Sequence, residues 1–352
     1  MTDMAMDIAS RVKAAYQAHT SLNITGAGSK FFLGRMSADA TPLDVKGHSG
    51  IIEYDPAELV MVARAGTPLL EIVNLLDDNQ QIIGFEPPFV DNGATLGGAI
   101  AAGLAGPARA YSGSVRDFIL GAGFINGKGE IITTGGKVMK NVAGFDLFRP
   151  MAGSMGTLGV LLKVAIRTVP RPEAELSLVQ EEDDEASALE KMNLWRVKTQ
   201  AVSGATWDGQ TIRIRLSGST AGVQHGRTQI GGEILLDETY WHDLNNHKLD
   251  FFKQKGRLWR ISVAAMSGPI SDGSSQLVDW GGAQRWLKSD ESPDSLRSRV
   301  TRLGGHATCF SDDQSVPTFQ PLEGNLLALN QRFKAALDPA GILNPGRMHP
   351  GL

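Results

Sequence analysis

The distribution of glycine limits what this chain can fold into more than any other feature of its sequence. Sixteen of its 41 glycines fall within residues 91–160, about one fifth of the 352-residue length. The same stretch carries regular apolar runs and few prolines, unlike a flexible linker. Glycine this dense within ordered structure indicates backbone at positive φ, or backbone that lies close to a flat or phosphorylated group.

Charge, cysteine and histidine content exclude several classes of protein. Lys and Arg number 34 against 38 Asp and Glu, a net charge of -4, which excludes a generally basic nucleic-acid binder. Cys309 is the one cysteine, so the chain alone forms no internal disulfide and no all-cysteine iron–sulfur cluster. His242 and His247 lie too far apart for one helical face, and we expect no metal site.

Neither a signal peptide nor a membrane helix is expected. The first ten residues carry Asp3 and Asp7 where a signal peptide carries Lys or Arg. The uncharged stretch 94–108 contains Pro107 and is shorter than the ~20 residues that a spanning helix needs. We therefore expect a cytoplasmic protein with no span of its own, which associates with a membrane only through partner subunits.

Apolar periodicity predicts the main secondary structure. Thr67 and Pro68 are expected to be the cap and the first residue of a helix, and the turn at 126–129 predicts a hairpin. The predicted helices are residues 5–19, 69–80 and 326–337, and the predicted strands are residues 22–25, 59–64, 117–125, 130–134 and 162–167.

The composition changes after Pro170 and Pro172. The acidic run 181–185 predicts a solvated loop or the start of a helix. All six tryptophans then lie between Trp195 and Trp286, which predicts a second core with its own pocket wall.

The glycine-rich loops do not fit the common nucleotide-binding motifs. A P-loop ending at Gly127-Lys128 would need glycine at position 122, which is Ala. A Rossmann motif beginning at Gly26 would need glycine at position 31, which is Phe. What remains is a compact loop at 25–30, whose successive N–H groups can bind an anion, and two glycine-rich turns at 95–98 and 153–160.

The order of these segments resembles the vanillyl-alcohol-oxidase, or PCMH-type, FAD-binding flavoproteins. Residues 25–30 (TGAGSK) are similar to the family's pyrophosphate loop, and residues 95–101 (TLGGAIA) to its second flavin-contacting segment. Residues 146–159, with DLFR and GSMGTLG, match its Asp-Leu…Gly-Ser-Glu-Gly-Thr-Leu-Gly stretch. Residues 338–347 resemble the C-terminal segment that returns to the flavin.

This resemblance implies an α+β fold and a division into three parts. Residues 1–172 would form a two-part PCMH-type FAD-binding domain, and residues 173–322 a smaller α/β cap domain for substrate or interaction. Residues 323–352 would return to the FAD domain. Over nearly its whole length the chain is similar to FAD-binding subunits of bacterial glycolate oxidase complexes, which oxidise glycolate to glyoxylate.

The same resemblance implies partners and a mode of cofactor binding. Electrons would pass from flavin to an iron–sulfur partner, in a hetero-oligomer that also holds a catalytic FAD subunit. The pyrophosphate loop lacks the histidine that often carries covalent flavin in relatives, so we expect non-covalent FAD.

The resemblance also implies a set of FAD-binding residues. Lys30 would add charge at the pyrophosphate or serve solubility, while Asn141 and Asp146 would bind ribityl or adenosine hydroxyls or cap local turns. The implied residues are Thr25, Gly26, Ala27, Gly28, Ser29, Lys30, Thr95, Gly97, Gly98, Ala101, Gly103, Asn141, Asp146, Gly153, Gly156, Gly159, Val160 and Asn344.

Catalysis is less well defined by the sequence. Relatives that oxidise 2-hydroxy acids typically carry Gly-His-x-Gly-Asp-Gly-Asn-x-His in the cap, and residues 304–310 keep only His306 of its polar groups. In one reading His306 is the base and Arg347 or Arg260 pairs the substrate carboxylate. In another the chain is a flavin-bearing scaffold or electron relay, which the missing residues favour. In a third interpretation the chain is a stand-alone FAD oxidase of another 2-hydroxy acid.

Overall fold

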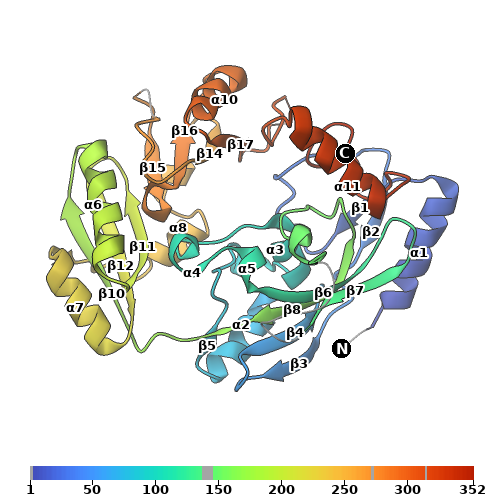
Figure 1. Ribbon diagram of the computed structural model, residues 1–352, viewed down its shortest axis with the longest axis horizontal. Coiled ribbons are helices and arrows are strands. Elements are labelled where there is room, and N and C mark those ends of the chain that lie inside the picture. Colours follow the sequence, from blue (N-terminus) through green and yellow to red (C-terminus); the bar gives the residue numbers. More distant parts are fainter. Residues whose placement is uncertain (1–2, 137–145, 271–272, 314) are drawn as a thin grey trace. The chain divides into compact units, whose positions relative to one another are not determined.

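The computed structural model describes residues 3–136, 146–270, 273–313 and 315–352 (Figure 1). It divides into two compact units: unit 1 is Met1–Ala105, Ser114–Pro170 and Pro321–Leu352, and unit 2 is Gly106–Gly113 and Arg171–Gln320. The short segment Gly106–Gly113, which the sequence division placed in the first domain, therefore groups with unit 2. The division at 172 and 322 stays a prediction for domains that fold independently.

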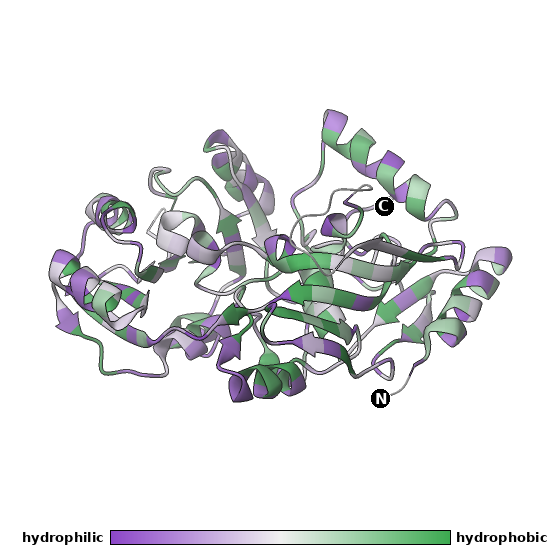
Figure 2. Ribbon diagram, turned by 60° about the horizontal axis from the view of Figure 1, so that its bottom comes forward, coloured by the Kyte–Doolittle hydropathy of each residue, from purple (hydrophilic) through white to green (hydrophobic). Residues whose placement is uncertain are grey.

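A five-stranded antiparallel sheet forms the centre of unit 1, in the order β3-β4-β8-β6-β7. Every residue of β6 is buried, because this strand is an apolar run covered on both faces. Figure 2 shows hydrophobic residues concentrated on the strands of this sheet. The strands are β3 (Ile51–Asp55), β4 (Val60–Arg64), β6 (Ile119–Ile125), β7 (Ile131–Gly135) and β8 (Val160–Arg167).

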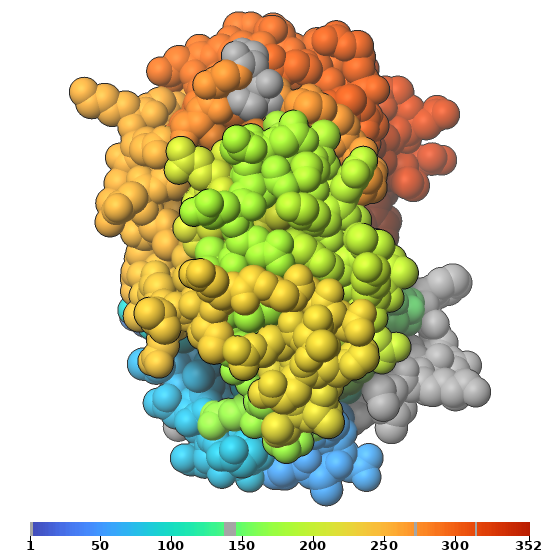
Figure 3. All heavy atoms as spheres, turned by 90° about the vertical axis from the view of Figure 1, so that its left-hand side faces the viewer, coloured from blue at the N-terminus to red at the C-terminus, as the bar shows by residue number. Residues whose placement is uncertain are grey.

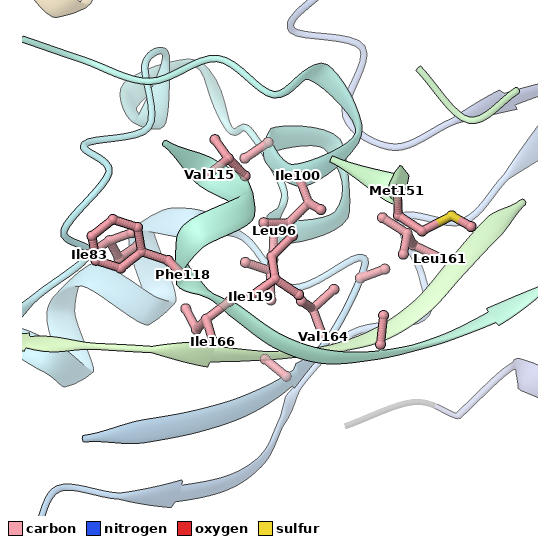
Figure 4. Close-up of a cluster of buried hydrophobic side chains, with 14 of the residues drawn as sticks. Ile83, Leu96, Ile100, Val115, Phe118, Ile119, Met151, Leu161, Val164 and Ile166 are labelled. Carbon is pink, nitrogen blue, oxygen red and sulfur yellow. The ribbon is translucent and has the colours of Figure 1, made fainter. Parts of the chain in front are cut away.

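The main core of unit 1 lies between this sheet and three helices. The helices are α2 (Leu69–Asp78), α3 (Leu96–Ala102) and α5 (Val115–Phe118). In Figure 4 the side chains of Leu96, Ile119 and Val164 lie together and the ring of Phe118 lies beside Ile83, and all of them are buried. Burial of each such side chain contributes roughly 1.5–3 kcal/mol, so α3 is held firmly in place.

A second, smaller core joins the two ends of the chain. It is formed by α1 (Ala5–Ala18), the parallel pair β1 (Leu22–Thr25) and β2 (Thr41–Asp44), and the C-terminal residues Ile342 and Leu343. The other elements of unit 1 are β5 (Gln81–Ile82), η1 (Val90–Asn92), η2 (Arg149–Met151), β9 (Val169–Pro170) and α11 (Gly324–Leu337).

Unit 2 is built on an eight-stranded sheet in the order β13-β10-β12-β11-β15-β16-β14-β17, and each pairing described in it is antiparallel. Its strands are β10 (Ala174–Glu181), β11 (Val202–Trp207), β12 (Thr211–Gly218), β13 (Glu233–Ile234), β14 (Leu258–Ser262), β15 (Gln276–Asp279), β16 (Gln284–Lys288) and β17 (His306–Cys309).

Helices cover this sheet. Figure 3 views the surface over α6 and α7, coloured lime green and yellow, which pack on β10, β11 and β12. Asp184, within the acidic run, caps α6 by accepting a hydrogen bond from Ser187 N. The helices are α4 (Arg109–Ser112), α6 (Glu185–Lys198), α7 (Thr220–Ile230), α8 (Tyr240–Asn245), α9 (Asp250–Lys253), η3 (Trp280–Gly282) and α10 (Pro293–Arg302).

The mixed helix and strand fold expected from the sequence is confirmed, with three local differences. Pro68 is the N-cap of α2 rather than its first residue, and Thr67 Oγ1 instead accepts a hydrogen bond from Gly50 N. Residues 117–118 end α5 and do not start β6. The glycine-rich turn at 95–98 is the start of α3, capped by Thr95.

A buried lysine fastens the C-terminal segment to the rest of unit 1. Lys334 Nζ lies 2.7 Å from Asp338 Oδ2 and donates to the carbonyl oxygens of Thr157 (2.7 Å) and Leu343 (2.8 Å). The Asp338 side chain is fully buried, so its charge depends on this partner. The ammonium group thus joins α11, the glycine-rich segment 153–159 and the C-terminal segment 338–347.

Lys334→Met should therefore destabilise unit 1. Removing one partner of a buried ion pair typically costs about 3–5 kcal/mol, because the remaining charge is left uncompensated. Urea unfolding followed by circular dichroism should show the lower midpoint. Lys13→Met, on the exposed face of α1, is the matched control and should stay within about 0.5 kcal/mol of wild type. Equal midpoints for the two variants would refute the fastening role.

Candidate functional site

The loop after β1 offers a row of unused backbone donors. Within the described residues, no N–H group from Gly26 to Lys30 donates a hydrogen bond to protein. Gly28 has φ +74°, a conformation that residues with a Cβ rarely adopt. Successive free N–H groups form a concave site that suits an anion.

The glycine-rich segments pack around this loop. The start of α3 lies beside it, and an added Cβ at Gly97 would meet the Cβ of Ala65 at 2.6 Å. Close packing within the protein alone thus requires glycine at position 97, whereas the sequence argument ascribed it to the cofactor. Segment 153–159 follows, and Met155 N donates to Ala101 O (2.8 Å).

Asn344 connects the C-terminal segment to both sides of the site. Its Oδ1 accepts a hydrogen bond from Ile24 N (2.7 Å), and its Nδ2 donates to Met155 O (2.6 Å). The side chain is only 4% exposed. A single amide therefore spans β1 and the glycine-rich segment, which are far apart in sequence.

These four segments line two adjoining clefts of about 510 and 480 Å³, volumes that include their open mouths. Thr95, Gly98, Ala101 and Asn344 line both of them. The first is walled mainly by the loop at 25–31, and the second also has apolar walls from Val45, Ala65 and Leu161. A polar cleft thus continues into a more apolar one, an arrangement typical of sites for a ligand with one charged and one flat part.

Two buried cations face the first cleft. Burial lowers the pKa of Lys30 to about 8 and that of Arg347 to about 10. Lys30 Nζ lies 3.2 Å from Ser29 Oγ, and Arg347 Nη2 donates to Lys30 O (3.2 Å), while Arg347 Nη1 is buried without a hydrogen-bond partner.

Neither cation has an anionic partner. Within the described part of the chain, no carboxylate forms an ion pair with Lys30 or Arg347. Buried charges are normally paired, so the cleft is electrostatically incomplete without an anion. A pyrophosphate meets this requirement, because it also accepts hydrogen bonds from the loop N–H groups.

Most of the residues expected at the cofactor lie on these clefts. Gly103 and Gly153 pack against each other nearby, Asp146 forms an exposed ion pair with Arg149, and Val160 lies in the core, so these four do not line either cleft. Asn141 lies outside the described residues. The residues that do line a cleft are Thr25, Gly26, Ala27, Gly28, Ser29, Lys30, Thr95, Gly97, Gly98, Ala101, Gly156, Gly159 and Asn344.

Arg347 has a different place from the one that sequence reasoning considered. It was a candidate for the substrate carboxylate, but it lies beside Lys30 at the free N–H groups. The sequence held one indication of this place: Arg347 lies three residues after Asn344, in the C-terminal segment that is expected to return to the flavin.

His306, the candidate base, lies in unit 2 at the first position of β17, where it is exposed. Partial burial of its ring, with the positive charges of Arg260 and Arg109, lowers its pKa. No ion pair joins His306 to a carboxylate in the parts of the chain that the structure describes. The same described parts contain no cluster of three or more metal-ligating side chains and no helix long and apolar enough to cross a membrane.

Comparison with known proteins agrees with this geometry. Residues 3–135 match the FAD binding domain family. The chain is 42% identical over 350 residues to glycolate oxidase subunit GlcE of Escherichia coli K12, covering 99% of both chains. It is 32% identical to glycolate oxidase subunit GlcD of Bacillus subtilis 168 over 129 residues, 37% of this chain and 27% of that relative.

Two solved structures of low sequence identity have the same fold. p-Cresol methylhydroxylase matches with a TM-score of 0.69 and 14% identity, over 99% of this chain and 88% of its own. Alkyldihydroxyacetonephosphate synthase matches with a TM-score of 0.69 and 13% identity, over 96% and 75%.

The fold is of the PCMH type, the chain contains an FAD binding domain, and FAD is its cofactor. Its sequence alignment with one relative covers 99% of the chain. The chain belongs to the family of the glycolate oxidase subunit GlcE.

The charge of Lys30 should make FAD binding depend on pH. With a pKa of about 8, Lys30 is charged at lower pH and becomes neutral as the pH rises through 8. Its attraction for a pyrophosphate is then lost, so FAD affinity should fall between pH 7 and pH 9.5. Titration of the apoprotein with FAD, followed by flavin fluorescence, measures this.

Two variants separate Lys30 from other titrating groups. Lys30→Met should bind FAD about tenfold more weakly at pH 7, the effect of one charge-assisted hydrogen bond, with a flatter pH profile. Lys30→Arg keeps the charge and should also flatten the profile. If wild type and Lys30→Met show the same dependence on pH, Lys30 does not contact the phosphates.

Proposed function

We propose that this chain is the FAD-binding subunit of a complex that oxidises glycolate to glyoxylate. The observation that carries the proposal is the cleft of unit 1, with its free N–H groups and two unpaired cations, in a chain aligned end to end with GlcE. Glycolate is proposed as the substrate because the relative is named a glycolate oxidase subunit. FAD is proposed as the cofactor held in the cleft because the free N–H groups and cations suit its pyrophosphate.

The residues of the cleft have separate parts in holding the cofactor. The N–H groups of residues 26–30, with Lys30 and Arg347, would bind the pyrophosphate, and the adjoining cleft beside Ala65 and Leu161 would take the flat flavin ring. FAD, when bound, accepts the two electrons that convert a 2-hydroxy acid to a 2-oxo acid. The pyrophosphate loop contains no histidine, so the FAD is non-covalent.

Electrons from the flavin require an acceptor outside this chain. Cys309 is 1% exposed in β17, and burial raises the pKa of its thiol, so it is neither a ready nucleophile nor a metal ligand. An iron–sulfur partner must therefore supply its own cysteines. We also propose a catalytic flavin subunit as a neighbour, because GlcD and GlcE are both named as subunits of glycolate oxidase, and a cytoplasmic location, with any membrane contact made by the partners.

A second candidate function is that of an electron relay, with substrate oxidised by the neighbouring flavin subunit. The observation that favours it is the environment of His306. No carboxylate in the described part of the chain forms an ion pair with the ring, and burial, followed by the charges of Arg260 and Arg109, lowers its pKa, which disfavours proton uptake. His306 is thus poorly suited to be the base.

The proposed function predicts a protein that works only in its complex. The purified chain should be yellow, release FAD on acid denaturation, and reduce an electron-accepting dye with glycolate far more slowly than the assembled complex. Dye-reduction assays of the chain and of the complex, matched for flavin content, make the comparison. A rate for the chain alone that equals the complex would contradict a subunit role, and covalently retained flavin would contradict the binding mode.

His306→Asn separates the two functions. In the assembled complex, glycolate turnover should stay within a few-fold of wild type, because another group serves as base. A catalytic base would instead give a loss of roughly 10²–10⁴-fold. Turnover is compared at equal FAD occupancy, measured by absorbance. A fall above 100-fold with FAD retained would show that His306 is the base.

A further inference from the structure

Within unit 2, Trp280 lies against two guanidinium groups. The Cζ atoms of Arg109 and Arg260 are 4.4 and 5.2 Å from the centroid of its ring. The ring is fixed, because Trp280 Nε1 donates to Gly106 O (2.9 Å) and the residue is 3% exposed. Its φ of +53° is unfavourable for a bulky residue, so the surrounding structure maintains strain here. Two like charges are therefore brought to one rigid surface.

Two nitrogen atoms of the Arg260 guanidinium have no hydrogen-bond partner in the described part of the chain. Its Nε donates to Gln284 Oε1, and its Nη1 and Nη2 atoms form no hydrogen bond with any residue that the structure describes. Burial, and then the charge of Arg109, lower the pKa of Arg260 to about 10. A guanidinium presents five N–H donors, so most of this side chain's hydrogen-bonding capacity is unused.

The acidic group in this region does not neutralise Arg260 directly. Asp279 Oδ2 accepts from Gln284 Nε2 (3.0 Å), and its Oδ1 accepts from Trp280 N (2.7 Å). Gln284 thus stands between the two, and Arg260 forms no ion pair in the described part of the chain. Asp279 offsets the field only in part, since Arg109 contributes a second positive charge.

Two histidines lie within the same positive field. Burial and Arg260 lower the pKa of His247 to about 3, and its ring stacks on Phe252 with centroids 4.3 Å apart. The pKa of His306 is lowered as well, with Arg260 and Arg109 among the causes. Both rings are therefore neutral at pH 7, so the positive charge at this place comes from Arg260 and Arg109 and not from the histidines.

We propose that Arg260 binds the carboxylate of a small monoanionic acid through Nη1 and Nη2, beside Trp280. The planar fork of a guanidinium matches a carboxylate in a bidentate pair. The choice of glycolate as the ligand rests on the proposed function, and the inference adds that this chain itself holds a site for the acid.

The test is a calorimetric titration of the FAD-loaded full chain with glycolate. Glycolate should bind, and glycolamide, its neutral analogue, should bind at least tenfold more weakly. Arg260→Met should weaken glycolate binding about tenfold or more, as expected for a buried charge-assisted pair. Arg260→Lys keeps the charge without the fork and should fall between. Arg227→Met, on the exposed face of α7, is the control and should bind as wild type.

Several results would overturn the inference. They are equal binding of glycolate and glycolamide, tighter binding of inorganic phosphate than of glycolate, and wild-type affinity in both Arg260 variants. If circular dichroism shows that Arg260→Met is unfolded, Arg260→Lys decides by itself. The proposed function fails separately, when the chain binds no FAD or the assembled complex does not oxidise glycolate. A complex that oxidises glycolate while Arg260 leaves binding unchanged would refute only the present inference.

Discussion

The two hydrogen bonds of Asn344 are the interaction on which the cofactor cleft depends. They tie β1 to the glycine-rich segment across 320 and 189 residues of sequence. Lys334 reinforces the arrangement, since its ammonium group donates to carbonyl oxygens of the glycine-rich segment (Thr157) and of the C-terminal segment (Leu343). Without these contacts the loop at 25–30 would have neither a far wall nor the guanidinium of Arg347 beside it.

Unsatisfied positive charge defines both sites. In unit 1, Lys30 and Arg347 are desolvated beside free N–H groups, and in unit 2 Arg260 is desolvated beside Trp280. In each case a folded chain without ligand bears the cost of burying a cation. Binding an anion removes that cost, so part of the folding energy is recovered only when the site is filled.

The sequence predicted the elements whose signals are local. The apolar periodicity of residues 5–19 and the hairpin turn at 126–129 both gave elements that the structure contains. Gly97 lines the second cleft, but its close contact with Ala65 could not be predicted, because that neighbour lies 32 positions away in the sequence. Arg347 and Arg260 were both possible carboxylate ligands until folding placed them in different units. Local patterns cannot supply such long-range placement.

The closure by Asn344 also has a consequence for synthesis of the protein. The ribosome makes the glycine loops early, but residues 344–347, which complete the cleft, emerge only after all of unit 2. A nascent chain therefore has no finished flavin site during translation. A chain truncated before this point would lack it permanently, so flavin retention distinguishes complete copies from prematurely terminated ones.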